Sequence, residues 1–173
     1  MLKRSLILVV AASVPLFAQA TANPAASAAR LIWESNQDFI TQSAADVPEN
    51  LYSFRPTPDV RTFGEIIGHV AGAQGMFCAI ALGEKVPAED AVEKTATTKA
   101  ALVDALKKSN EYCARAYAMT DQAAVAMVDL FGQQRSKLYA LMMNASHNAE
   151  HYGNLVTYMR INKIVPPSSR PGR

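Results

Sequence analysis

The stretch that decides the fold is Ser146-His147-Asn148-Ala149-Glu150-His151-Tyr152-Gly153-Asn154-Leu155-Val156-Thr157-Tyr158-Met159-Arg160, which places two histidines four residues apart. In a helix, residues four apart lie one turn above each other on the same face, so two imidazoles at this spacing can bind one metal ion. The chain has a single further histidine, His69, within a second helical pattern. Three histidines, two of them at ligand spacing, predict a helical bundle built around a three-ligand metal site.

The composition favours a single helical domain. A chain of 173 residues is long enough to bury a sizeable core and has the length of one domain. Half of its residues are hydrophobic but only 8% are aromatic, and alanine, leucine and methionine are plentiful. This composition is more typical of a helix bundle than of a β-sandwich.

The first residues of the chain, 1–20, are predicted to be a signal peptide. Lys3 and Arg4 form a basic start, residues 5–17 form a short apolar segment, and residues 18–20 supply small side chains for cleavage. The apolar run is too short for a transmembrane helix, although an uncleaved anchor is the alternative. We therefore expect a periplasmic or secreted protein with no membrane attachment after cleavage.

Cleavage at this place would leave a chain with almost no net charge. Loss of Lys3 and Arg4 lowers the number of lysines and arginines from 17 to 15, which equals the 15 aspartates and glutamates. No basic cluster remains that would attract nucleic acid or anionic lipid. We expect an unknown small molecule as the substrate and no nucleic-acid partner, and the oligomeric state stays open, with a homodimer as one option.

Hydrophobic periodicity predicts four long helices within a domain that covers residues 24–165. The predicted helices are 24–45, 60–82, 97–119 and about 134–162. Residues 46–60 contain three prolines, which forbid a continuous helix there. Residues 120–131 allow a strand-like or a short helical segment, and residues 166–173 are expected to be a disordered tail.

The predicted helices place the three histidines in different environments. His69 lies on the inward stripe of the second helix, beside Gly68 and Gly72, which permit the close approach of a neighbouring segment. His147 and His151 lie on a flank of the fourth helix, between its core side and its solvent side. A flank suits a site with water access, but a lone histidine on an apolar face is more often a core residue than a ligand. A helical protein without a metal is therefore one alternative.

Several segments together carry a resemblance to a known family. They are residues 48–58 (PENLYSFRPTP), 61–70 (RTFGEIIGHV), 147–155 (HNAEHYGNL), 158–160 (YMR) and the two prolines at 166–167. The chain resembles the DinB/YfiT-like superfamily of metal-binding four-helix bundles across its mature length. Asn154 stands where this family often has glutamine, and either amide can form a hydrogen bond.

The resemblance implies a fold and a metal site. The fold is an all-α four-helix bundle in which a long crossover joins the second and third helices. The site binds one divalent metal ion through His69, His147 and His151. Zinc or nickel suits three imidazoles, and geometry alone seldom selects between them.

The implied crossover bears on the two cysteines, Cys78 and Cys113. Residues 84–95, at about 3.3 Å per residue, are long enough to span a helix and let the second and third helices run parallel. In such a pair the two cysteines fall at similar heights. A disulfide is then expected in an oxidising compartment, with two buried free thiols as the alternative.

Two classes of function follow from this resemblance. The first is an enzyme, either a metal-dependent hydrolase or a transferase that activates a small thiol, with Glu65 and Glu150 as candidate catalytic residues that handle protons. Glu65 could instead orient a ligand imidazole, and Glu150 could simply be solvated. The second is a non-catalytic helical protein of the cell envelope that binds a metal or a small ligand. Both classes stay open at this point.

Overall fold

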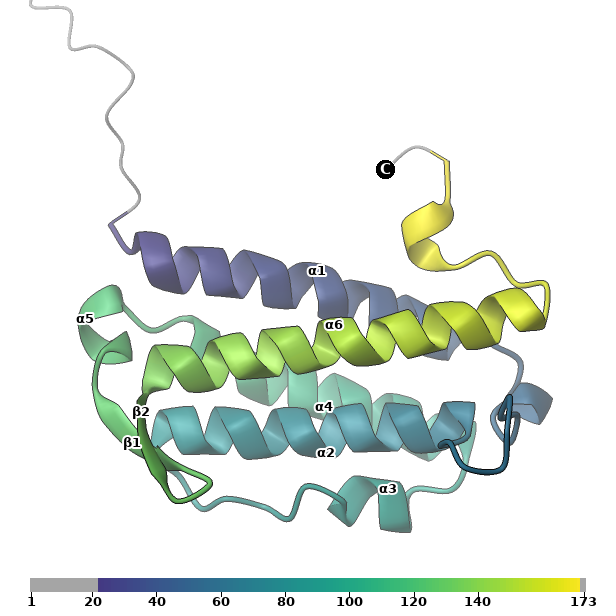
Figure 1. The fold of residues 1–173 in the computed structure, drawn as a ribbon, viewed down its shortest axis with the longest axis horizontal. Coiled ribbons are helices and arrows are strands. Elements are labelled where there is room, and N and C mark those ends of the chain that lie inside the picture. The colour runs from purple at the N-terminus through teal and green to yellow at the C-terminus, as the bar shows by residue number, and fades with distance from the viewer. Residues whose placement is uncertain (1–21, 172–173) are drawn as a thin grey trace, which may run out of the picture.

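Four long helices form a bundle, which confirms the predicted all-α fold. They are α1 (Pro24–Asp46), α2 (Phe63–Leu82), α4 (Lys99–Tyr117) and α6 (Lys137–Ile161). The computed structural model describes residues 22–171, so the predicted signal peptide lies outside the described residues. Figure 1 shows that α2 and α4 run in one direction while α1 and α6 run in the other.

The connection between α2 and α4 is the long crossover that the resemblance implied. Gly83 ends α2 in a left-handed conformation with a φ of 73°, which glycine adopts without strain. The chain then returns along the side of α2, where it forms the short helix α3 (Ala91–Thr95) before α4 begins (Figure 1). The crossover is therefore packed on the bundle.

Short polar side chains fix where the helices begin. Thr62 accepts a hydrogen bond from the backbone N–H of Glu65, whose carboxylate accepts one from the backbone N–H of Thr62 in return. This capping box begins α2. Thr98 and Ser136 cap α4 and α6 in the same way through their hydroxyl oxygens. The loop before α2 also holds the one-turn 3₁₀ helix η1 (Glu49–Leu51).

A small hairpin before α6 is an addition to the predicted helices. The segment contains both of the expected alternatives, the short helix α5 (Asp121–Ala124) and the strand β1 (Met127–Leu130), and β1 pairs antiparallel with β2 (Gln133–Ser136). Phe131 and Gly132, both at positive φ, form the turn. Helix α6 consequently begins at Lys137, later than the predicted residue 134, because residues 133–136 pair with β1.

Helix α2 is the core of the bundle. Nearly all of its residues are buried, and it packs against α4, α6 and α3. By length and composition alone it could cross a membrane, but 78% of its most apolar window is buried inside the bundle. This burial is what a core helix of a folded domain shows.

A disulfide joins α2 to α4. Cys78 and Cys113 are both fully buried, and their Cα atoms lie 5.3 Å apart. The pairing expected from parallel helices is therefore confirmed, and no free cysteine remains among residues 22–171.

The prediction of a disordered tail is wrong for residues 166–171. The 3₁₀ helix η2 (Pro167–Ser169) packs against α1, and Pro167 is buried. The hydroxyl of Tyr152 donates to Ser168 Oγ at 2.7 Å and accepts from the Ser168 backbone N–H at 2.9 Å. Arg170 forms an ion pair with Asp46 at the end of α1. These contacts, which are distant in sequence, hold the segment in place.

Candidate metal centre

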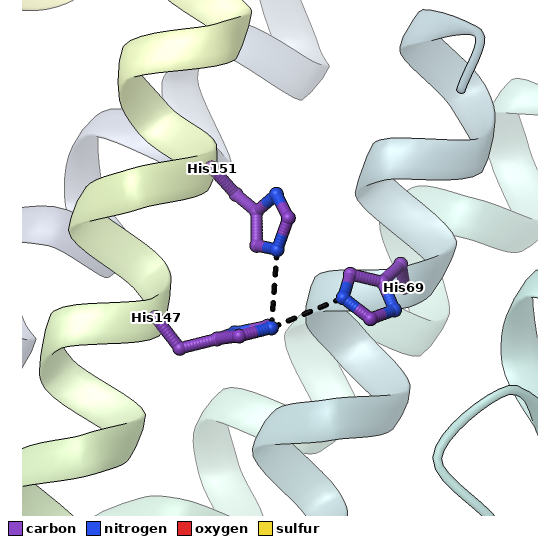
Figure 2. Close-up of side chains that lie close together, drawn as sticks. All are labelled: His69, His147 and His151. Carbon is purple, nitrogen blue, oxygen red and sulfur yellow. Dashed lines mark hydrogen bonds between the residues drawn. The ribbon is translucent and has the colours of Figure 1, made fainter. Parts of the chain in front are cut away.

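The three histidines meet between α2 and α6. His69 comes from the middle of α2, and His147 and His151 come from successive turns of α6 (Figure 2). The Nε2 atom of His147 lies 3.0 Å from Nε2 of His69 and 3.1 Å from Nε2 of His151. The potential ligand atoms of all three lie within 4.8 Å of one another. The three histidines that the sequence singles out therefore lie together in the fold.

The spacing of these nitrogens fits a single metal ion. At metal–nitrogen distances of 2.0–2.1 Å, two ligands at a tetrahedral angle lie about 3.3 Å apart. The two short distances at His147 are close to this value. One shared proton cannot satisfy three nitrogens that converge on a point, whereas one cation can accept a lone pair from each of them.

Burial keeps the imidazoles neutral, which is the form that binds metals. Burial lowers the pKa of His69 to about 4, and the nearby charges of Arg61 and His151 add to the effect. Burial also lowers the pKa of His147 to about 3. The adjacent Asn148 side chain opposes this lowering, although it forms no hydrogen bond of normal geometry with the His147 ring. The pKa of His151 is lowered by burial as well, against the opposing charge of Glu150.

The outward-facing ring nitrogens differ in their surroundings. His151 Nδ1 lies 3.4 Å from the side-chain amide of Asn154, whose oxygen and nitrogen can exchange places to suit the ring. His69 Nδ1 lies 3.7 Å from Oε2 of Glu93. His147 Nδ1 is buried and has no hydrogen-bond partner among the described residues. Two of the three rings therefore have a polar neighbour on the side away from the cluster.

The two predicted catalytic glutamates do not contact the histidines. Within residues 22–171, no hydrogen bond or ion pair joins Glu65 or Glu150 to the cluster, although both line the adjoining cleft. The Glu65 carboxylate is occupied by the capping box and by an ion pair with Arg55. The backbone N–H of Thr62 is the main reason that its pKa is lowered. Glu150 is exposed to solvent between the two histidines of α6.

The structure adds two carboxylates that the sequence reasoning missed, Glu89 and Glu93. Both belong to the crossover, and each lies within 4 Å of the His69 ring. The signal that could have found them is the row of glycines on α2. A Cβ atom at Gly68 would lie 2.8 Å from the Cα atom of Glu93, so the expected close approach occurs, and the segment that makes it is the crossover.

An open cleft of about 800 Å³ adjoins the cluster at His151. The loop 55–61 forms one wall, and Glu150, Asn154 and Tyr158 of α6 form another. The Tyr158 hydroxyl donates to the backbone carbonyl of Arg61 at 2.7 Å, which ties the loop to α6. The volume suits a small molecule.

A buried polar network fixes α6 against α1, α2 and α4 next to the histidines. Gln74 lies at its centre and is fully buried. Its side-chain oxygen accepts hydrogen bonds from Trp33 at 2.7 Å and from Asn148 at 2.9 Å. Its side-chain nitrogen donates to Ser109 and Asn110 on α4. The network positions Asn148, the neighbour of His147.

Comparisons with known proteins agree with this architecture. The model of the DinB superfamily matches residues 32–155. A DinB-like protein from Bacillus cereus superposes with a TM-score of 0.71 at 20% identity, covering 82% of this chain and 95% of its own. A DinB-like protein from Bacillus subtilis gives 0.64 at 19%, with coverages of 86% and 99%.

A third similar structure is a mutant of the mycothiol-dependent maleylpyruvate isomerase. It superposes with a TM-score of 0.65 at 15% identity, covering 75% of this chain and 60% of its own. No curated protein matches the sequence. At these identities the solved structures establish the fold alone.

Proposed function

The chain belongs to the DinB superfamily, and from this membership and the histidine cluster we propose that it binds one divalent metal ion through His69, His147 and His151. The observation that carries the proposal is the convergence of neutral imidazoles from α2 and α6 to within 4.8 Å. Zinc and nickel are the metals that we expect, since both accept imidazole ligands.

We infer further that the centre is catalytic and acts on a small molecule, as a hydrolase or a transferase. A bound divalent metal would supply Lewis-acid chemistry or lower the pKa of a water or thiol. The described residues supply the rest: α2 and α6 hold the three rings, and the cleft of about 800 Å³ gives a small molecule access beside His151. Glu150, exposed at this cleft, is the more available proton acceptor, because the Glu65 carboxylate is engaged at the start of α2.

The proposed location of the protein bears on the reaction. Disulfides persist in oxidising compartments, so the pair Cys78–Cys113 supports a periplasmic or secreted protein. The likeness to an isomerase named for its mycothiol dependence supports a thiol cosubstrate. Reduced small thiols are scarce outside the cytoplasm, however, and we therefore place metal-dependent hydrolysis before thiol transfer.

Elemental analysis of protein purified without a histidine tag tests the metal site. The cluster contains all three histidines of the chain, so histidine-dependent binding reports on this site alone. The protein is compared with His69→Ala, His151→Ala and the control Glu111→Gln, which removes an exposed carboxylate on α4. We expect one metal per chain in the parent and the control, and a loss in both histidine variants.

Two results would overturn the proposal. One is the absence of metal from the parent protein after incubation with zinc and with nickel. The other is metal that both histidine variants retain. A third result would instead support the non-catalytic binding function. In that case the protein binds its metal but hydrolyses no small ester or amide and transfers no thiol.

A further inference from the structure

We propose that the crossover completes the metal centre, with Glu89 as a fourth protein ligand and Glu93 as a positioning residue for His69. This inference rests on the metal binding proposed above and extends it to residues of a segment that connects two helices. The two carboxylates come from one short stretch of chain and approach the two nitrogens of the same imidazole.

Glu89 lies near the ring nitrogen of His69 that faces the cluster. Its Oε1 atom is 3.8 Å from His69 Nε2, the atom that points toward His147. A nitrogen and an oxygen bound to the same zinc ion lie about 3.4 Å apart at a tetrahedral angle and roughly 4.2 Å apart when opposite each other. The observed separation from His69 Nε2 falls between these values. Glu89 is not among the residues whose ligand atoms already lie within 4.8 Å of one another, so its side chain, which is 44% exposed, would rotate to reach the metal. The described residues offer the Glu89 carboxylate no other ion pair, so it is free to bind.

Glu93 lies near the other nitrogen of the same ring. Its Oε2 atom is 3.7 Å from His69 Nδ1, while its Oε1 atom accepts a hydrogen bond from Arg61 Nε at 2.9 Å. The side chain is only 18% exposed, and Arg61 restricts its position. A carboxylate at Nδ1 favours the tautomer with a proton on that nitrogen, which leaves the lone pair of Nε2 for a metal.

Charge gives a reason for two carboxylates at this place. Three neutral imidazoles leave the charge of a divalent cation uncompensated in a site that is largely shielded from water. A partly buried charge is costly unless opposite charge lies near it. Glu93 also forms an ion pair with Arg61, which offsets its negative charge. Glu89 is therefore the carboxylate whose charge remains to balance that of the metal.

The position of the crossover is fixed by α2 itself. Gly68, the residue directly before His69, and Gly72, almost one turn after it, let the backbone of residues 89–93 lie directly against the helix. Any side chain at either position would push the segment outward. The two carboxylates are therefore carried by backbone that packs tightly beside the ligand.

Metal titration of three alanine variants tests the inference. Glu89→Ala and Glu93→Ala remove the two carboxylates, and Asp90→Ala is the matched control, because it removes a charge from the same segment that pairs with Lys94 instead of a histidine. Zinc affinity is measured by competition with a chelator, and the visible absorption spectrum of the cobalt(II) form reports the number of ligands. Circular dichroism verifies that each variant is folded.

We expect Glu89→Ala to lower the zinc affinity by about 10–100-fold and to change the cobalt spectrum, since a ligand is lost. We expect Glu93→Ala to lower the affinity by about 10-fold, with partial recovery in Glu93→Gln, which keeps an oxygen acceptor. Asp90→Ala should match the parent in both measurements.

The outcomes separate this inference from the proposed function. A parent protein that binds no zinc and no cobalt would overturn the metal site itself. A parent that binds one metal while Glu89→Ala keeps the affinity and spectrum of Asp90→Ala would overturn the role of Glu89 and leave the three-histidine site intact. Equal affinities for Glu93→Ala and Asp90→Ala would overturn the positioning role.

Discussion

Gly72 lies against the backbone of Glu89 so closely that a Cβ atom at position 72 would be 1.9 Å from the Glu89 carbonyl oxygen. No side chain fits in this space unless the crossover moves. The absence of a side chain at one position of α2 therefore determines where the segment that carries Glu89 and Glu93 can lie.

Substitution of this glycine should destabilise the protein. We expect Gly72→Ala to lower the free energy of unfolding by about 1–3 kcal/mol, because the new methyl group collides with backbone. Gly75→Ala is the matched control: its Cβ would meet only Pro87 Cγ, at 3.9 Å, and alanine favours a helix by up to about 1 kcal/mol. Urea unfolding followed by circular dichroism measures both. Equal stabilities would show that the crossover moves away without cost.

Reduction of the disulfide should lower the free energy of unfolding by more than the loss of any single exposed contact would. The bond between Cys78 and Cys113 closes a loop with a sequence separation of 35 residues. The loss of this constraint on the unfolded chain corresponds to about 3–4 kcal/mol. Urea unfolding with and without reductant measures the effect, and the double variant Cys78→Ala/Cys113→Ala should be insensitive to reductant. A parent protein that unfolds at the same urea concentration in both buffers would contradict the prediction.

Glu65 should contribute to stability in a pH-dependent manner. Its pKa is lowered from the usual 4.5, chiefly by the hydrogen bond from the backbone N–H of Thr62. A lowered pKa in the folded state gives a stabilisation that is present above pH 4.5 and is lost as the pH falls through the folded value. At neutral pH we expect Glu65→Gln to cost about 0.5–1 kcal/mol, from loss of a negative charge at the start of α2.

Urea unfolding of the parent and Glu65→Gln over a series of pH values measures this difference. The two proteins should converge in acid below the lowered pKa, where Glu65 is protonated and resembles the amide. A difference of the same size at all pH values would show that the charge of Glu65 plays no part in the cap.

The stability of the protein should fall even when Gln74 is replaced by a residue of similar volume. Gln74→Leu would leave the indole N–H of Trp33 and the amide of Asn148 buried without their acceptor. Each unsatisfied buried group costs about 1–3 kcal/mol, so for the two groups we expect a total loss of about 2–6 kcal/mol. Thermal unfolding measures it, with the exposed Gln122→Leu as the control. A small loss would mean that water enters and replaces the missing acceptor.

The fold could be predicted from the sequence where patterns are long. The periodicity of α1, α2, α4 and α6 and the spacing of His147 and His151 led to the bundle and to the ligand set. The hairpin was ambiguous, because residues 127–136 are too few to show a period and their pairing depends on a turn at Phe131 and Gly132. The tail was mispredicted because a proline- and serine-rich segment gives no local sign of its contacts with α1 and α6.

The part of the site that could not be predicted comes from the crossover. Glu89 and Glu93 follow a stretch with no clear periodicity, and their distance from His69 depends on how the chain returns along α2. The sequence points to Glu65 and Glu150 because both are near the histidines along the chain. In a helix, a residue adjacent to a ligand points about 100° away from it, as Glu150 does from His151.

The burial of α2 also has a consequence for the unfolded chain. Before the bundle forms, its 20 residues are an apolar segment with the length and mean hydropathy of a membrane span, and only contacts with the other helices cover it. The partner helices lie on both sides in the sequence, so the segment stays exposed until α6 has been made. Partly folded molecules should therefore associate through α2, and the yield of refolding should fall as the protein concentration rises.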